Sequence, residues 1–256
     1  MGSSIRERDL HIGGLQKSSL IDFPGKVGCV IFLKGCNFRC PYCHNPELVE
    51  GNGRDCSEIS EEFLWEFLEQ RRGLLDGVVI SGGEPTLQPW IFDLCEGLKD
   101  LGYAVKLDTN GSRPEIVEDL LKGGLVDYIA MDIKSDPAGY RSVTREEGAS
   151  DKILKSIKLI MDNAPAYEFR TTCVRPLVDN SRMRTIARMV EKANLYVLQA
   201  AHQTKVLCPE FFNGLSQASA GLGGGNKRGT PILSKNELEA LKSIVEPFVN
   251  RCIIRS

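Results

Sequence analysis

The chain has 256 residues, and its 32 Lys and Arg against 34 Asp and Glu give a formal net charge of −2 at pH 7. This balance argues against a broadly basic surface for nucleic acid, and no apolar run approaches the roughly 20 residues that span a bilayer. Nine cysteines behind an N-terminus without an apolar signal segment predict a reducing, cytoplasmic location. A chain of this length can bury a sizeable core, so we expect a single domain over residues 1–256.

Short apolar runs alternate with amphipathic stretches along the chain. The run VGCVIFL at 27–33 is apolar on both faces, as strands of parallel sheets are. Ser60 is expected to cap a helix that carries Phe63 and Leu68 in its apolar stripe and ends by Gly73. The further strands are predicted at 77–81, 103–108, 126–133, 167–174 and 195–200, and the further helices at 89–101, 114–122, 151–163 and 180–193.

Six strands joined by helices imply right-handed βαβ crossovers and a parallel sheet. Six units are fewer than the eight of a closed TIM barrel, so we expect an α/β fold, an open, partial (β/α)6 barrel with its core at about 20–205. A doubly wound flat sheet is the alternative, because the pattern does not give strand order. The Gly-rich segment 213–231 predicts a flexible loop, as a linker, lid or partner contact. Residues 232–256 predict a helix at 235–249 and an extension that packs back on the domain.

Three cysteines, Cys36, Cys40 and Cys43, follow the first predicted strand at i, i+4 and i+7. Iron–sulfur cubanes are normally held by four cysteines, so a segment with three would leave one iron without a protein thiolate. An open metal position is where chemistry occurs, as in catalytic zinc sites. A structural zinc site that adds His44 is the alternative, although adjacent Cys43 and His44 would strain a tetrahedron. Any one of the three could also be a buried free cysteine or form a disulfide.

The Cys-x3-Cys-x2-Cys spacing, with Tyr42 before the last cysteine, resembles the signature of radical S-adenosylmethionine enzymes. The strings FLKGCNFRCPYCHNPELV and SLIDFPGKVGCVIF resemble the glycyl-radical-enzyme activases, most of all the anaerobic ribonucleoside-triphosphate reductase activating proteins. The resemblance runs from about Ile12 to His202. It implies an oxidoreductase with one [4Fe-4S] cluster on three cysteines, S-adenosylmethionine as cofactor, and a flavodoxin- or ferredoxin-type electron donor. The implied reaction cleaves S-adenosylmethionine to a 5′-deoxyadenosyl radical, which abstracts a hydrogen atom from a backbone glycine of a glycyl radical enzyme.

Polar residues follow the predicted strands, at the edge where α/β sheets bind ligands. Gly82 and Gly83 lack Cβ atoms and let the backbone approach a ligand, while Glu84 offers an acceptor for an ammonium group. A tight turn is the alternative explanation for the two glycines. The resemblance implies that this Gly-Gly-Glu segment holds the methionyl amino group.

Two later strands end in LDTNG and MDIK, which also resemble activase segments. The resemblance implies that Asp108, Thr109 and Asp132 form a monovalent-cation site beside the S-adenosylmethionine carboxylate, and hard oxygen ligands suit such a cation. Asp and Asn also favour turns, which is the alternative for the first segment. Lys134 is a candidate for ribose or carboxylate contact, with a solvated surface lysine as the alternative.

Two further side chains complete the predicted site. Tyr42 is expected to meet an adenine, although core packing would also explain an aromatic ring there. His202 matches a ligand-contacting histidine of the resembling activases, with a structural histidine as the alternative. Arg170 lies within a predicted strand, where it could point inward at a carboxylate or at a loop of the partner, and it is not assigned to the site. Two other functions remain open: a radical enzyme acting on a small molecule, similar to deazaguanine synthases, and a zinc- or cluster-bearing binding module without turnover.

Overall fold

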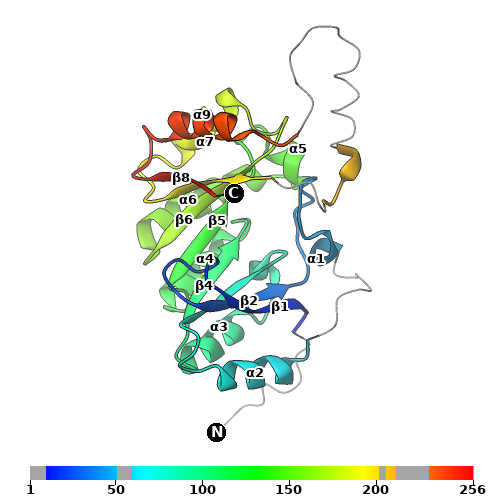
Figure 1. The fold of residues 1–256 in the computed structure, drawn as a ribbon, viewed down its shortest axis with the longest axis vertical. Helices are drawn as coiled ribbons and strands as arrows, with labels where there is room; N and C mark the ends of the chain where they lie inside the picture. Colours follow the sequence, from blue (N-terminus) through cyan, green and yellow to red (C-terminus); the bar gives the residue numbers. More distant parts are fainter. Residues whose placement is uncertain (1–9, 51–58, 202–205, 212–230, 256) are drawn as a thin grey trace.

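The computed structural model describes residues 10–50, 59–201, 206–211 and 231–255, and its strands form one curved sheet (Figure 1). Within these ranges the eight strands lie side by side in chain order: β1 (Ile12–Ser19), β2 (Gly28–Leu33), β3 (Gly77–Gly82), β4 (Ala104–Thr109), β5 (Tyr128–Asp132), β6 (Tyr167–Cys173), β7 (Tyr196–Ala200) and β8 (Cys252–Arg255). β1 is antiparallel to β2, and all the other neighbouring pairs are parallel. The sheet has two free edges, which confirms the open, partial barrel and excludes the doubly wound alternative, whose strand order reverses.

The longer helices surround the outer side of this sheet (Figure 1). The described helices are α1 (Pro46–Glu50), α2 (Glu61–Gln70), the 3-10 turn η1 (Pro85–Leu87), α3 (Ile91–Asp100), α4 (Pro114–Lys122), α5 (Tyr140–Thr144), α6 (Ala149–Asn163), α7 (Asn180–Met189) and α9 (Lys235–Val245). The predicted cap of α2 is confirmed, because the Ser60 hydroxyl accepts a hydrogen bond from the Phe63 amide at 3.2 Å. The prediction that Phe63 is part of the apolar stripe is wrong, since this ring is 44% exposed and lies under the Lys17 ammonium, 5.7 Å from its centroid. None of the described helices has the length and apolar character of a membrane-crossing segment.

Two strands were not predicted, and both lie at sheet edges. β1 reads IGGLQKSS, where two glycines and a polar half hide the strand pattern, and β8 has only four residues. The predicted helices at 180–193 and 235–249 end earlier, at Met189 and Val245. Most of the predicted loop at 213–231 and all of His202 lie outside the described residues, and the single-domain organisation stays a prediction.

Alternation along the strands decides which residues reach the inner face of the sheet. Val79 and Ala130 belong to a small apolar cluster that also contains Phe23, Val30 and Tyr128. Side chains two positions apart share a face, so Ser81 and Asp132 lie on the same inner face, closer to the carboxyl ends of their strands. The inner face therefore changes from apolar to polar toward one rim of the half-barrel.

Candidate active site

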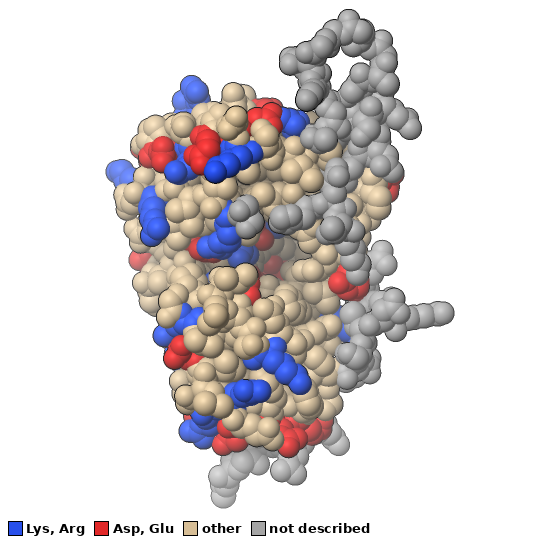
Figure 2. All heavy atoms as spheres, viewed as in Figure 1, with Lys and Arg blue, Asp and Glu red and all other residues tan. Residues whose placement is uncertain are grey.

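A cavity of ≈ 240 Å³ lies at the carboxyl ends of the strands. The face drawn in Figure 2 is hollowed near its middle, where acidic and basic side chains meet. Two groups of residues form the walls. We call residues 34–45, which follow β2, the cysteine loop. We call the second group the charged ladder: Asp108, Asp132, Lys134 and Arg170 line the cavity, and Lys106 lies beneath them, paired with Asp108.

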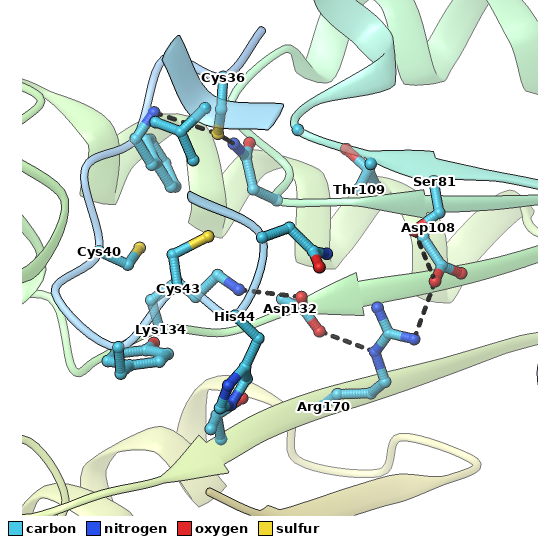
Figure 3. Close-up of a pocket in the computed structure, with 18 of the residues that line it drawn as sticks. Cys36, Cys40, Cys43, His44, Ser81, Asp108, Thr109, Asp132, Lys134 and Arg170 are labelled. Carbon is cyan, nitrogen blue, oxygen red and sulfur yellow. Dashed lines mark hydrogen bonds and ion pairs between the residues drawn. The ribbon is translucent and has the colours of Figure 1, made fainter. Parts of the chain in front are cut away.

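The cysteine loop brings its three thiols to the cavity wall. Cys36, Cys40 and Cys43 all line the cavity, and their sulfurs lie around the same part of it (Figure 3). The loop is held from outside by a 3.0 Å hydrogen bond from the Arg39 amide to the Thr144 carbonyl in α5. The Phe38 amide donates to the Cys36 sulfur at 3.4 Å. The structure thus brings the three predicted metal ligands together.

Burial keeps these thiols protonated in the absence of a metal. It raises the pKa of Cys36 to about 11, with help from the Glu84 charge, and raises the pKa of Cys40 to about 12. The pKa of Cys43 is also raised by burial. Because only thiolates bind metals, loading this site must release protons.

The thiols and their neighbours suit a metal cluster better than a single metal ion. Among the described residues, no three His, Cys, Asp or Glu side chains converge on one point as ligands of a single ion. An iron–sulfur cluster makes a different demand, because each thiolate binds its own iron. The Tyr42 ring lines the same cavity, and its buried hydroxyl has no hydrogen-bond partner in the described part of the chain. A buried orphan hydroxyl is costly, so it fits a cavity that receives a polar ligand.

The two glycines after β3 let this loop meet the cysteine loop. Gly82 has φ +120°, and a Cβ added to Gly83 would lie 2.0 Å from the Gly35 carbonyl oxygen. The amides of Gly83 and Glu84 donate to the carbonyls of Leu33 and Gly35, each at 2.8 Å. Both glycines line the cavity, so their backbone remains close to any ligand there.

Glu84 has a different place from the predicted one. Its side chain is fully buried and is not among the residues that line the cavity. One carboxylate oxygen accepts hydrogen bonds from the Thr86 amide, the Thr86 hydroxyl and the Thr109 hydroxyl at 3.1, 2.5 and 2.7 Å. The other accepts from the Asn110 amide at 2.6 Å. The prediction of a direct contact with an amino group is therefore revised for this side chain, which joins the loops after β3 and β4.

The charged ladder is a chain of ion pairs across β4, β5 and β6 (Figure 3). Arg170 stands at its centre, 2.7 Å from Asp132 through Nε and 3.1 Å from Asp108 through Nη1. Lys134 pairs with Asp132 at 2.9 Å, and Lys106 pairs with Asp108 from deeper in the barrel. The two carboxylates predicted as cation ligands are thus brought together, with an arginine between them.

The ladder holds its groups in their charged forms. Burial alone would raise the pKa values of Asp108 and Asp132. The nearby positive charges outweigh burial and hold both pKa values below their ordinary values: Arg170 acts on both carboxylates, Lys106 on Asp108 and Lys134 on Asp132. Burial likewise opposes the charge of Lys134, yet Asp132 raises the pKa of that ammonium well above its usual range. The ladder therefore presents fixed charges at neutral pH.

Sequence reasoning missed part of the cavity wall. Arg170 was left without a committed role, although an arginine between Phe169 and Thr171 in a predicted strand could point inward at a carboxylate, as it does here. Asn37, which does not itself line the cavity, was also missed: its amide donates to the Ser112 hydroxyl at 3.1 Å and its oxygen accepts from the side chain of the lining residue Asn110 at 3.1 Å. The other lining residues without a prediction are Phe38, Asn45, Val49, Ser81, Thr172 and Gln199.

Comparison with known proteins agrees with this geometry. The model of the Radical SAM superfamily matches residues 30–189. The chain is 35% identical over 252 residues to a protein of Methanocaldococcus jannaschii named a glycyl-radical enzyme activating enzyme, a match that covers 96% of this chain and 95% of that protein. It is 33% identical over 157 residues to the pyruvate formate-lyase-activating enzyme of Clostridium pasteurianum, covering 59% of this chain and 64% of the enzyme.

A solved structure is similar in fold. SuiB of Streptococcus suis, determined with S-adenosylmethionine bound, superposes with a TM-score of 0.58 at 15% identity, over 86% of this chain and 48% of SuiB. At this identity the likeness concerns the fold alone. The sequence matches carry the assignment: the chain belongs to the radical SAM superfamily, in the group of its glycyl-radical enzyme activating enzymes.

Proposed function

We propose that this chain cleaves S-adenosylmethionine reductively and abstracts a hydrogen atom from a backbone glycine of a glycyl radical enzyme, with anaerobic ribonucleotide reductase as the target. The single observation that carries the proposal is the shared cavity: three thiols on one wall face fixed charges on the other. The superfamily implies a [4Fe-4S] cluster and S-adenosylmethionine. The relatives' names support activation of a glycyl radical enzyme.

Each wall has its own task in this proposal. Cys36, Cys40 and Cys43 would hold the cluster and leave one iron without a protein ligand. The backbone of Gly82 and Gly83 would approach the methionyl amino group, and Arg170 with Lys134 would attract the methionyl carboxylate, because charge-assisted pairs are the strong ones. Tyr42 would meet the adenine.

When bound, the cluster and S-adenosylmethionine would supply the radical chemistry, namely reductive cleavage with one electron from a flavodoxin- or ferredoxin-type donor and abstraction of a hydrogen atom. The protein's part is to orient the ligand and to exclude water. His202 stays a predicted ligand contact, and a cytoplasmic location is part of the proposal, supported by the eight described cysteines, all free.

The test begins with anaerobic reconstitution of the full chain with iron and sulfide. S-adenosylmethionine, a chemical reductant and a candidate reductase chain are then added, and electron spin resonance should show a glycyl-type radical on that chain. A partner variant with the target glycine replaced by alanine should lack the signal. Cleavage of S-adenosylmethionine without any protein radical would instead favour a small-molecule substrate, and tight zinc binding without cleavage would favour a binding module.

A further inference from the structure

The charged ladder leaves no carboxylate oxygen without a cationic partner. Oδ2 of Asp108 meets Arg170 at 3.1 Å and Oδ1 of Asp132 meets it at 2.7 Å. Oδ2 of Asp132 meets Lys134 at 2.9 Å, and Oδ1 of Asp108 meets the Lys106 ammonium. A monovalent cation at this place would need oxygen ligands. Each oxygen of these two carboxylates is already paired with a lysine or arginine side chain.

The third expected ligand is also engaged. The Thr109 hydroxyl donates to Glu84 at 2.7 Å and accepts from the Gly111 amide at 3.1 Å. Thr109 lines the cavity, but its hydroxyl is engaged by the fully buried Glu84 carboxylate and by the Gly111 amide. The side-chain oxygens predicted to form a cation site therefore do not fit that role in this chain.

Lys106 is the unusual member of the ladder. It lies two residues before Asp108 on β4, so it shares the inner face one layer deeper, and it is only 1% exposed. Its ammonium lies 5.9 Å from the centroid of the Tyr128 ring, a cation–π distance. A lysine is rarely buried so completely unless it is paired, and here the pair is with a cavity-lining carboxylate.

We infer that the Lys106 ammonium takes the place of the monovalent cation, so that S-adenosylmethionine binding by this protein needs neither sodium nor potassium. The charge balance supports this. The ladder holds the cations of Lys106, Arg170 and Lys134 against the carboxylates of Asp108 and Asp132, which leaves one positive charge. The methionyl carboxylate would be attracted by that charge, whereas a further cation placed among these side chains would be repelled by it. The inference rests on the proposed function only in taking S-adenosylmethionine as the ligand.

The test measures the dissociation constant of S-adenosylmethionine for the reconstituted, oxidised protein, in potassium, sodium or choline chloride at equal ionic strength. The dissociation constant of the wild type should differ by no more than about twofold among the three salts. A tenfold difference would correspond to the gain or loss of a substantial contact. Lys106→Met should bind about tenfold more weakly in choline, as expected for loss of one charge near the ligand, and potassium or sodium should restore most of that affinity. Lys106→Arg keeps the charge and should stay independent of the salt. Lys158→Met is the matched control, because Lys158 is an exposed lysine paired only within α6.

Cation-dependent binding by the wild type would overturn the inference, and this series needs no variant that could fail to fold. Equal weakening of Lys106→Met in every salt would overturn it as well, since Lys106 would then have only a structural role. Crystals soaked in rubidium give a second readout: an anomalous peak between Asp108 and Asp132 in the wild type would contradict the inference. Failure to bind S-adenosylmethionine in any salt would reject the proposed function together with it, whereas binding without any glycyl radical would reject only the proposed function.

Discussion

The two walls of the cavity are built in opposite ways. The cysteine loop is irregular backbone whose three functional groups come from one short segment of the chain. The charged ladder gathers its groups from three strands, and its central pair joins residues 62 positions apart. A loop can adapt to a group that it binds, while side chains on hydrogen-bonded strands hold their positions.

The walls also differ in how far their polar groups are partnered in the absence of a ligand. The thiols are buried and protonated, and the Tyr42 hydroxyl has no partner among the described residues. The ladder's charges are already paired with one another. The cysteine loop is therefore completed by binding, whereas the ladder is organised in advance, which reduces the cost of orienting a ligand.

The largest effect should come from the loop. Cys40→Ala removes one of three thiolates, so we expect complete loss of the cluster and of S-adenosylmethionine cleavage, while the fold persists. Iron and sulfide content and the visible absorption spectrum measure the cluster, and chromatography of the products measures S-adenosylmethionine cleavage. Cys95→Ala is the control, because Cys95 is equally buried but lies in α3 away from the cavity. Retention of a reducible cluster by Cys40→Ala would show that the loop does not use all three thiols.

Removing a charge from the ladder should lower the stability of the fold as well as the affinity for S-adenosylmethionine. Arg170→Met leaves two carboxylates without their shared partner, and removing one side of a buried ion pair costs about 3 kcal/mol of unfolding free energy. Urea unfolding of the metal-free protein measures this. The exposed pair of Arg141 and Glu147 offers the control, since Arg141→Met should cost less than about 1 kcal/mol. If both variants lose equally little, the ladder is not the organised wall described above.

This difference also explains what could be read from the sequence. The cysteine loop was predictable because its spacing is local, and the polar residues after β3, β4 and β5 were predictable because strand ends share one edge. Arg170 and Asn37 were missed because their roles depend on register and on contacts between distant loops. β1 was missed because this edge strand has a polar half, and β8 because its apolar run is only part of a four-residue strand.

Glu84 shows the limit of motif reasoning. A carboxylate after two glycines at a strand end looked available for a ligand, but the side chain turns inward toward four donors from neighbouring backbone and threonines. Whether a carboxylate faces a cavity or a loop depends on backbone direction, which spacing alone does not give. Its role then becomes one of positioning.

A third prediction tests whether this carboxylate joins the loops after β3 and β4. Glu84→Gln keeps the size of the side chain but replaces one acceptor oxygen with an NH2 donor, which would face the N–H or O–H groups that now donate to Glu84. The unfolding free energy should therefore fall by about 2 kcal/mol. Cluster content should be unchanged, and S-adenosylmethionine should bind more weakly through displacement of the Gly82–Gly83 backbone. Glu69→Gln, in an exposed pair with Arg72, is the control. Weaker binding at wild-type stability would restore the direct contact that the structure disfavours.

The smallest effect should come from the contact between the cysteine loop and the loop that follows β4. Asn37 in the cysteine loop exchanges hydrogen bonds with Ser112 and accepts one from Asn110, both after β4, and the Asn110 side-chain nitrogen also lies 4.0 Å from the Cys36 sulfur. Asn37→Ala should lower the unfolding free energy by about 1 kcal/mol, since a part-buried hydrogen bond contributes on that order. It should also change the cluster's reduction potential slightly, because polar groups near the sulfurs tune it. Asn163→Ala, at the exposed end of α6, is the control for loss of an asparagine side chain. A potential equal to that of wild type, with stability also unchanged, would mean that the adaptable loop and the fixed ladder act independently.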